Sequence, residues 1–195
     1  ALAGNDVVYA AGGNDNVQGG TGNDSLYGEA GSDTLDGGLG DDLLVGGADA
    51  GSDSYRFGNG RGTDRVDAGV PGIVASLDRV LIDAGLAPDQ ITLLRNGADL
   101  VLGAPDGSTM RVLGFFTAVG AGQVGRVTSV QFADAAGTIW DTNYLRSHSG
   151  EGTEASDVFI GDAGDNEFYL LGGNDRAEGR GGNDFMDGGD DADTL

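Results

Sequence analysis

The chain contains no cysteine and a single histidine, so two common ways of holding a small fold together are absent. Without cysteine, neither disulfides nor thiolate metal sites can stabilise it. One histidine disfavours an imidazole-based zinc or iron centre. Basic side chains are also scarce, since 10 Lys+Arg residues accompany 32 Asp+Glu residues for a formal net charge of −22. A field of this sign argues against nucleic acid and anionic membranes as partners and favours cations.

Long apolar runs are missing as well. No stretch approaches the ~20 consecutive apolar residues of a membrane span, and no basic-then-apolar signal peptide opens the chain. The sequence has no initiator Met, and its first and last repeats look cut. We therefore interpret it as a piece of a longer protein, whose targeting signal could lie outside this stretch.

Catalytic motifs are not found in the sequence. There is no Gly-x-Ser-x-Gly elbow, no His-Glu-x-x-His and no phosphate-binding loop. His148 has Ser147 and Ser149 as neighbours and Asp141 nearby, but adjacency in sequence does not make a triad, so a surface histidine is the favoured interpretation. We expect a chain that is not an enzyme in itself, although the full-length parent could be one.

Glycine, in contrast, is abundant: 39 of 195 residues, against an ordinary level of roughly 7%. The glycines recur with aspartate in a nine-residue unit, Gly-Gly-x-Gly-x-Asp-x-hydrophobic-x, as in residues 19–27. Glycine permits backbone with positive φ and leaves carbonyls uncovered, and aspartate supplies a hard oxygen ligand. The last three positions alternate outward, inward, outward, as in a short strand. The unit is therefore half metal-binding turn and half strand.

Aligning the units shows how regular they are. Five aspartates follow one another at nine-residue intervals, each with a glycine two residues before it and an apolar residue two residues after it: Asp6, Asp15, Asp24, Asp33 and Asp42. A sixth unit with a two-residue insertion places Asp53 eleven residues after Asp42.

These units resemble the RTX (repeats-in-toxin, haemolysin-type) calcium-binding nonapeptides. The resemblance implies an all-β fold in which two nonamers make one coil of a parallel β-roll. Units two apart then stack on the same side. Asp6, Asp24 and Asp42 would form one column, and Asp15, Asp33 and Asp53 the other.

Calcium is the cofactor that this arrangement favours, with several ions per chain. Layers of a sheet lie about 4.8 Å apart, and two carboxylates at that separation repel by roughly 3 kcal/mol at an effective dielectric constant near 20. Calcium takes about six to eight oxygen ligands and tolerates backbone carbonyls, whereas magnesium prefers stricter geometry and keeps its waters.

The resemblance also implies the ligands. Each ion would take two Asp carboxylates, carbonyls from positions two and four of one turn, and carbonyls from positions one and three of the next. One site would use Gly20, Gly22 and Asp24 with Gly37, Leu39 and Asp42. The layer before it would use Leu2, Gly4 and Asp6 with Gly19, Thr21 and Asp24. On the other side, Ala11, Gly13 and Asp15 would face Gly28, Ala30 and Asp33. The pair Asp33–Asp53 is less certain, because the insertion lies inside its last turn.

A disordered Gly/Asp-rich linker is the alternative interpretation of this block, because high charge and low hydrophobicity favour disorder. For the calcium-free chain it is the expected state. One inward Val or Leu per nonamer buries too little apolar surface to offset the ordering entropy.

In the middle segment, residues 58–151, the nonamers stop. Asp64 lies eleven residues after Asp53, and the arguments for and against it as a further ligand are evenly balanced. Asp78 is disfavoured as a ligand because no glycine turn precedes it. Residues 91–95 and 100–104 are predicted to form a hairpin around Asn96-Gly97. Further strands are expected at 109–116, 127–132 and 138–140, followed by a short helix over 144–146 capped by Asp141 or Thr142.

This segment is similar to the haemolysin-type calcium-binding-related module that accompanies RTX repeats. The matching stretches are Gly97–Leu102, Val112–Phe116, Val130–Asp134 and Ile139–Trp140. Its aromatic residues can build a core, and a roll needs its open end covered. The expected fold is thus two β-roll blocks, 1–57 and 152–195, flanking a mostly antiparallel β module with one short helix.

The second block, residues 152–195, resumes the nine-residue register with Asp157, Asn166, Asp175, Asp184 and Asp193. Asn166 removes one carboxylate, so a site between Asn166 and Asp184 should be weaker than those pairing Asp157 with Asp175 or Asp175 with Asp193. Ala155 and Asp191 stand where the fourth-position glycine is expected, which puts the turn geometry there in doubt.

Together these features predict a calcium-binding region of a secreted, extracellular bacterial RTX protein that folds when calcium binds. The family implies the type I secretion machinery as a partner, and we expect a monomeric fragment. Two alternatives stay open. One is a calcium-dependent adhesin or surface-layer segment, with a host-cell or glycan receptor contacted through the parent protein. The other is the carboxy-terminal region of a secreted toxin, protease or lipase.

Overall fold

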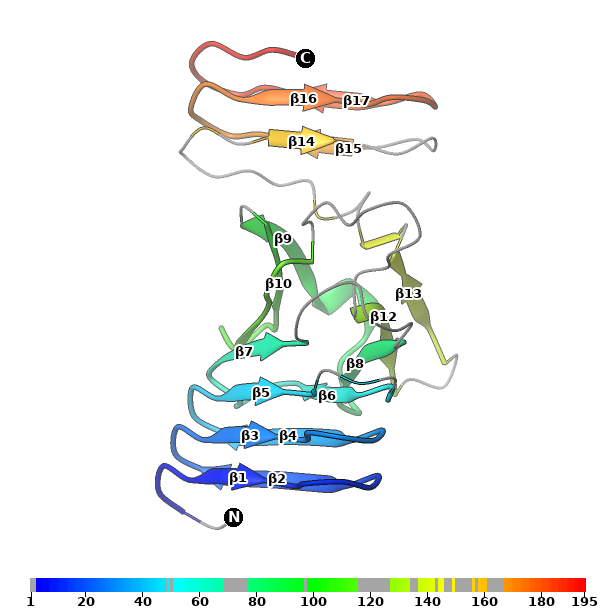
Figure 1. Cartoon of the computed structure of the whole chain (residues 1–195). Coiled ribbons are helices and arrows are strands. Elements are labelled where there is room, and N and C mark those ends of the chain that lie inside the picture. Colours follow the sequence, from blue (N-terminus) through cyan, green and yellow to red (C-terminus); the bar gives the residue numbers. More distant parts are fainter. Residues whose placement is uncertain are drawn as a thin grey trace.

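The computed structural model describes residues 3–47, 49, 51–68, 77–96, 98–115, 127–133, 137–142, 144–145, 149, 156, 158–160 and 167–195. Parallel strands are stacked in layers at the N-terminal end of the molecule and again at its C-terminal end (Figure 1). This is the all-β parallel roll architecture that the repeats predict. Among the described residues, no helix is long and apolar enough to cross a membrane.

The first roll consists of two parallel sheets. One contains β1 (Val7–Tyr9), β3 (Ser25–Tyr27), β5 (Leu43–Val45) and β7 (Thr63–Asp67). The other contains β2 (Asn16–Thr21), β4 (Thr34–Leu39), β6 (Ser54–Phe57) and β8 (Asp78–Ile82). Val8 pairs with Leu26 and Leu26 with Leu44, so strands eighteen residues apart are neighbours and two nonamers make one coil.

The inward positions of the repeats form the core between the two sheets. Leu26, Leu35 and Leu44 are fully buried, as are Tyr55 and Val66 in the later layers. In β3, β5 and β7 buried side chains alternate with half-buried or exposed ones, as the nonamer pattern predicts.

Both sheets continue without a break past residue 57. β11 (Thr109–Val112) adds to β7 in parallel, and β10 (Asp99–Gly103) and β9 (Thr92–Asn96) follow as antiparallel strands. In the second sheet, β12 (Val127–Phe132) lies parallel to β8 and antiparallel to β13 (Ile139–Asp141). One hydrophobic core therefore runs from Val17 to Leu145. The division at 1–57, 58–151 and 152–195 stays a prediction.

The helical content differs from the expectation. The short helical element that the structure describes in full is a 3-10 turn, η1 (Pro88–Gln90). In this turn the Gln90 side chain accepts a hydrogen bond from Ala87 N at 2.8 Å. The segment in which the sequence predicts a helix, residues 144–146, lies partly outside the described residues. Within it, Tyr144 N donates to Asp141 Oδ1 at 2.8 Å, as the predicted cap requires.

The second roll has its own small core. β14 (Val158–Ile160) pairs in parallel with β16 (Arg176–Glu178), and β15 (Glu167–Tyr169) with β17 (Phe185–Asp187). A separate cluster of buried side chains fills the space between them: Phe159, Phe168, Leu170 and Ala177. The Phe159 and Phe168 rings lie 5.5 Å apart, next to the small Ala177.

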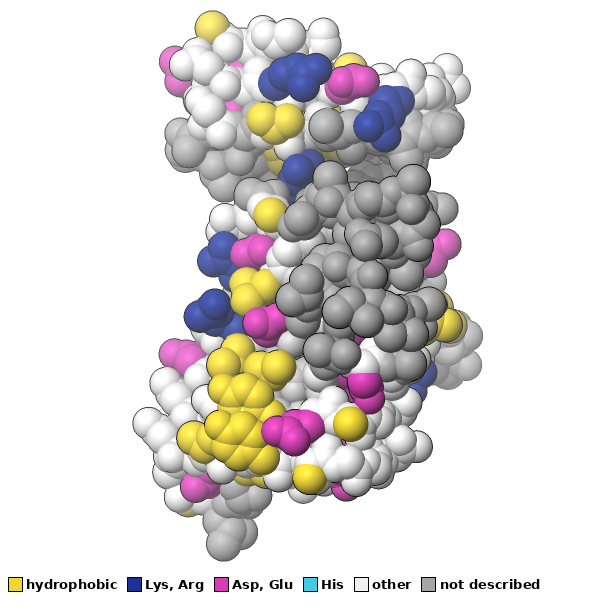
Figure 2. Space-filling view, viewed as in Figure 1, with side chains coloured by type: hydrophobic (Ala, Val, Ile, Leu, Met, Phe, Trp, Pro, Cys, Tyr) yellow, Lys and Arg dark blue, Asp and Glu magenta, His cyan; other side chains and the backbone are white. Residues whose placement is uncertain are grey.

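The outer face of the first roll carries an apolar stripe. Tyr9, Tyr27 and Val45 are register partners along β1, β3 and β5, and the two tyrosine rings stack at 4.7 Å. Figure 2 shows hydrophobic side chains gathered over this part of the molecule.

Candidate calcium-binding site

The periodic aspartates stack into two columns along the sides of the first roll. Column A consists of Asp6, Asp24, Asp42 and Asp64, and column B of Asp15, Asp33, Asp53 and Asp78. In each column, Oδ1 of one aspartate accepts a hydrogen bond from the backbone N–H of the aspartate one layer earlier, at 2.7 to 3.1 Å. Each carboxylate is thereby held in one orientation.

In several of these aspartates the other carboxylate oxygen, Oδ2, has no hydrogen-bond partner. Oδ2 is buried and forms no hydrogen bond in the following aspartates: Asp15, Asp24, Asp33, Asp42, Asp64 and Asp175. A buried, unpaired carboxylate oxygen is costly, because its water shell has been removed and nothing replaces it. The same unpaired atom in successive layers therefore indicates a missing positive partner.

In Asp24 and Asp33 this oxygen points into a small cradle beside the first glycine of the turn, Gly19 and Gly28 respectively. A Cβ added to Gly19 would collide with Asp24 Oδ2 and with the carbonyl of Gly37 in the next layer. At Gly28, a Cβ would collide with Asp33 Oδ2 and lie 2.8 Å from the carbonyl oxygen of Gly46. Each of these cradles is thus a small space bordered by a carboxylate oxygen and a backbone carbonyl oxygen. Oxygen ligands of these two kinds suit calcium.

The remaining predicted carbonyl ligands lie between stacked turns. Gly4, Gly13 and Gly22 have φ of 106°, 129° and 114°, a backbone that favours glycine. The position-three carbonyls of Thr21, Ala30 and Leu39 accept hydrogen bonds of 2.8 Å from Gly4, Gly13 and Gly22 N.

Two further predicted carbonyls face the next turn. A Cβ on Gly38 would collide with the carbonyl of Gly20. Ala11, at φ 72°, accepts a hydrogen bond from Ala30 N at 3.0 Å.

The insertion in the sixth unit leaves column B intact. Asp33 N donates to Asp53 Oδ1 at 2.9 Å although the two residues are twenty apart. The inserted Asp49 closes its own loop by accepting hydrogen bonds from Gly51 N and from Gly31 N, at 3.0 and 2.6 Å.

The second roll repeats this geometry where it is described. Asp175 N donates to Asp193 Oδ1 at 3.0 Å, and a Cβ on Gly179 or Gly188 would collide with Oδ2 of Asp184 or Asp193. Asp191 takes φ 79°, so this non-glycine residue adopts the left-handed backbone at the fourth position. The predicted ligands Leu2, Asp157 and Asn166 lie outside the described residues, and so does Ala155.

Burial governs the ionisation of the columns. Removal from water raises the pKa of Asp33 and of Asp42, and the charges of Asp15 and Asp24 in the layers before them raise these pKa values further. Burial raises the pKa of Asp64 to about 8, assisted by the charge of Asp42 and opposed by Arg61. In the absence of a cation, the deepest carboxylate of column A is thus held partly protonated near neutral pH.

No group of three or more His, Cys, Asp or Glu side chains is gathered for a metal in the described ranges.

Asp78 is the column member that the sequence analysis missed. It is fully buried, and its Oδ1 accepts the hydrogen bond from Asp53 N at 2.9 Å. The stretch Leu77-Asp78-Arg79-Val80 does keep the Asp-x-apolar half of the nonamer. Its glycine turn is absent, and its 25-residue spacing from Asp53 hides the register.

A second ladder of side chains joins the same turns. Oδ1 of Asn5 accepts from Asn23 N at 2.9 Å, and Oδ1 of Asn23 accepts from Asp41 N at 3.1 Å. Asn14 and Ser32 do the same on the other side of the roll. These position-five residues hold the turns together without a metal, a role that the sequence pattern did not reveal.

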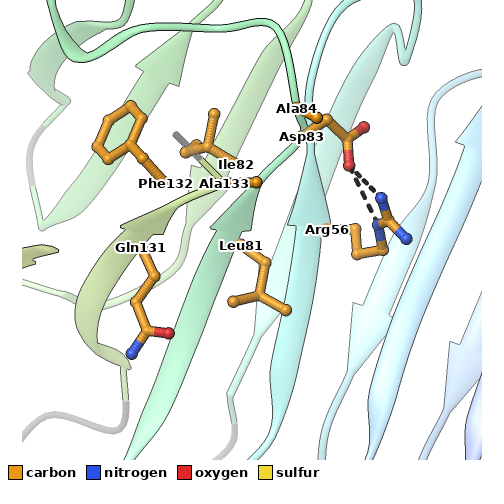
Figure 3. Close-up of a pocket in the computed structure, with 8 residues that line it drawn as sticks. All are labelled: Arg56, Leu81, Ile82, Asp83, Ala84, Gln131, Phe132 and Ala133. Carbon is orange, nitrogen blue, oxygen red and sulfur yellow. Dashed lines mark hydrogen bonds and ion pairs between the residues drawn. The ribbon is translucent and has the colours of Figure 1, made fainter. Parts of the chain in front are cut away.

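A cavity of about 340 Å³ lies elsewhere, at the ends of β8 and β12. Its lining residues are Arg56, Leu81, Ile82, Asp83, Ala84, Gln131, Phe132 and Ala133 (Figure 3). Arg56 donates to Asp83 at 2.6 Å, and Arg61 joins Asp83 to Asp36. These ion pairs neutralise the charges of Arg56 and Asp83 at the cavity.

Comparison with protein families agrees with the geometry of the turns. The model of the RTX calcium-binding nonapeptide repeat matches residues 1–26, 9–44, 18–52, 151–176 and 160–195. Both blocks belong to the RTX calcium-binding nonapeptide repeats. RTX repeats bind calcium and are typical of secreted proteins.

Other comparisons add little. No curated protein sequence matches the chain. Among solved structures, the chain is similar to the extracellular lipase LipA from Serratia marcescens, with 20% sequence identity and a TM-score of 0.40. The likeness covers 97% of this chain and 27% of the lipase, so the chain corresponds to about a quarter of that protein's length.

Proposed function

We propose that this chain is a calcium-driven folding and stabilising region of a secreted bacterial RTX protein and is not catalytic in itself. The observation that carries the proposal is the row of buried, unpaired Oδ2 atoms in columns A and B. Oδ2 of Asp24 and Oδ2 of Asp33 each face a glycine cradle that a carbonyl of the next layer also lines. Such a row is unfavourable in a fold without cations.

The columns make the binding of successive ions cooperative. When bound, a calcium ion supplies positive charge and oxygen coordination between two turns. Asp24 lies between Asp6 and Asp42 and is tied to both by hydrogen bonds. Fixing Asp24 therefore orders a cradle on each side, so filling one layer prepares the next. The free energy of calcium binding then contributes directly to the free energy of folding.

The same design suits export. With a net charge of −22 and few inward apolar residues per coil, the chain resists folding where calcium is scarce, as in a cytosol. Outside the cell, at calcium near the millimolar range typical of extracellular sites, the cradles fill and the roll forms. Passage through a type I secretion machinery fits a chain that stays unfolded until it emerges.

Circular dichroism with and without calcium tests the proposal. The strand spectrum and a cooperative melt are expected in calcium and should be lost in chelator, with magnesium a poor substitute. An Asp24→Asn/Asp33→Asn variant keeps the side-chain size, removes one carboxylate from each column and should need more calcium to fold. A strand spectrum that survives chelator unchanged in the unsubstituted chain would contradict calcium-driven folding.

A further inference from the structure

The last layer of column B contains an inward-facing residue that differs from those of the earlier layers. The inward positions of the earlier layers are all aliphatic: Val8, Val17, Leu26, Leu35 and Leu44. In the next layer of the second sheet this position is Tyr55, fully buried between its register partners Leu35 and Val80. A buried tyrosine needs a partner for its hydroxyl.

The hydroxyl of Tyr55 reaches out of the core into the last cradle of column B. A Cβ added to Gly46 would collide with Asp53 Oδ2 and with the Tyr55 hydroxyl oxygen, so both atoms border the same small space. The hydroxyl donates a hydrogen bond to Asp78 Oδ2 at 3.5 Å. One layer earlier, the equivalent space beside Gly28 is bordered by Asp33 Oδ2 and the Gly46 carbonyl, without a hydroxyl.

The carboxylates differ accordingly. In column B, Oδ2 of Asp15 and of Asp33 is buried without a partner. Asp53 and Asp78 are as deeply buried, yet neither belongs to the unpaired set within the described residues. In the last layer of this column, Asp78 Oδ2 thus has a neutral hydroxyl as a hydrogen-bond donor.

Column A ends differently. Its last inward residue is Val66, the register partner of Leu44, which is aliphatic and carries no hydroxyl. Oδ2 of Asp64 stays buried and unpaired.

We propose that the Tyr55 hydroxyl closes column B by occupying its last cradle, so that the Asp53–Asp78 layer holds no calcium while column A stays open up to Asp64. This inference rests on the proposed function, because it assumes that the other cradles bind calcium. The hydroxyl gives Asp78 a hydrogen bond without bringing positive charge, and it fills space that an ion would need. Tyr55 is thus a residue that sets the number of ions.

Replacing Tyr55 with the usual inward residue of the repeat tests this. Tyr55→Leu removes the hydroxyl and opens the cradle between Asp53 and Asp78. Equilibrium dialysis or native mass spectrometry in calcium should count one more ion per chain than in the unsubstituted protein. The double variant Tyr55→Leu/Asp78→Asn should return to the original count. An unchanged or lower count in Tyr55→Leu overturns the proposal, and a lower count would make the hydroxyl a ligand.

Two further variants guard against misfolding as an explanation. Tyr55→Phe keeps the ring in the core and removes only the hydroxyl, so it should gain the same ion as Tyr55→Leu. Because the packing of the ring is preserved, a gain in this variant cannot come from a disturbed core. An unchanged ion count in Tyr55→Phe would overturn the role of the hydroxyl. Tyr27→Leu is the matched control on the outer face and should leave the ion count unchanged.

The same measurements separate the two proposals. If the unsubstituted chain binds no calcium, the proposed function itself fails. If it binds calcium and Tyr55→Leu gains no ion, the inference about Tyr55 fails alone.

Discussion

The backbone N–H of Asp24 donates a hydrogen bond of 2.7 Å to Oδ1 of Asp42, eighteen residues further along the chain. Asp24 Oδ1 in turn accepts one from Asp6 N at 2.8 Å, while its Oδ2 stays buried and unpaired. Through its side chain and its backbone, Asp24 is therefore hydrogen-bonded to the layers on both sides of it in column A. This sharing makes the aspartates unequal, although their repeats look alike in sequence.

Asp24→Ala is expected to damage calcium-induced folding more than Asp193→Ala. The first removes a carboxylate with a column neighbour on each side, whereas Asp193 lies at the end of its column and is tied by hydrogen bond to Asp175. Calcium titrations followed by circular dichroism should show the larger rise in midpoint for Asp24→Ala. Asp89→Ala is the control, because it removes the same charge from an exposed position away from the columns. Equal shifts at Asp24 and Asp193 would contradict the stacked columns.

Gly19→Ala should remove calcium binding from one layer of column A without unfolding the chain. The added Cβ enters the cradle between Asp24 Oδ2 and the Gly37 carbonyl. Gly12→Ala is a matched control in the same roll, because a Cβ there would lie 3.9 Å from its nearest neighbour, Ala30 O. Isothermal titration calorimetry should report fewer ions for Gly19→Ala and the original count for Gly12→Ala. The same loss in both variants would point to a general effect on the turns.

The regular part of the fold can be predicted from the sequence because each nonamer has the same pattern. A glycine turn, an aspartate and one inward apolar residue define the layer, and the nine-residue period defines which layers stack. This sufficed to pair Asp6 with Asp24 and Asp24 with Asp42.

What the sequence could not supply were contacts that depend on tertiary arrangement. Asp78 joins column B without a glycine turn, because β8 pairs in parallel with β6 and brings it into register. The parallel pairing of β7 with β11 spans 46 residues, from Thr63 to Thr109, and no local sequence pattern predicts it. The contact that the Tyr55 hydroxyl makes could not be predicted from the sequence either, since an aromatic residue at an inward position is simply expected to fill the core.

Acid should stabilise the calcium-free fold. Burial raises the pKa of Asp64 to about 8 from an ordinary value of 3.8, so folding favours the protonated carboxyl. For a raised pKa, the contribution to stability is fully present below the unfolded-state value and is lost as the pH rises through the folded-state value. The strand signal that circular dichroism detects in calcium-stripped buffer, small near neutral pH, should therefore increase as the pH falls from about 8 to about 4.

Asp64→Asn is the control for this pH dependence. Asparagine does not ionise, so the strand signal of this variant should vary less over the upper part of that range. In calcium the trend should reverse, because protons then compete with the ion for the carboxylates. A calcium-free strand signal that rises from pH 4 to pH 8 would contradict the role of burial at these aspartates.

Asn23→Ala should weaken the roll without removing an ion. The side chain accepts a hydrogen bond from Asp41 N at 3.1 Å but is exposed and lies outside the cradles. A loss of about 1 kcal/mol in the unfolding free energy of the calcium-loaded chain is expected for one such bond. Calorimetry should give an unchanged ion count beside a lower melting temperature. A reduced count would place Asn23 among the ligands.

Core substitutions should show which parts of the chain fold together. Leu102 is fully buried in the core that runs from Val17 to Leu145, whereas Phe168 lies in the separate core of the second roll. Leu102→Ala should cost about 2–5 kcal/mol and raise the calcium midpoint of the first roll, although Leu102 lies far along the chain from the columns. Phe168→Ala should affect the second roll alone.

Hydrogen exchange in calcium can separate the two effects, because β1 to β8 and β14 to β17 give distinct peptides. Faster exchange throughout β1 to β8 in Leu102→Ala, with β14 to β17 unchanged, is the expected result. Phe168→Ala should give the reverse pattern. If Leu102→Ala left β1 to β8 as protected as before, the middle segment would not stabilise the first roll, and its role would be limited to separating the two blocks.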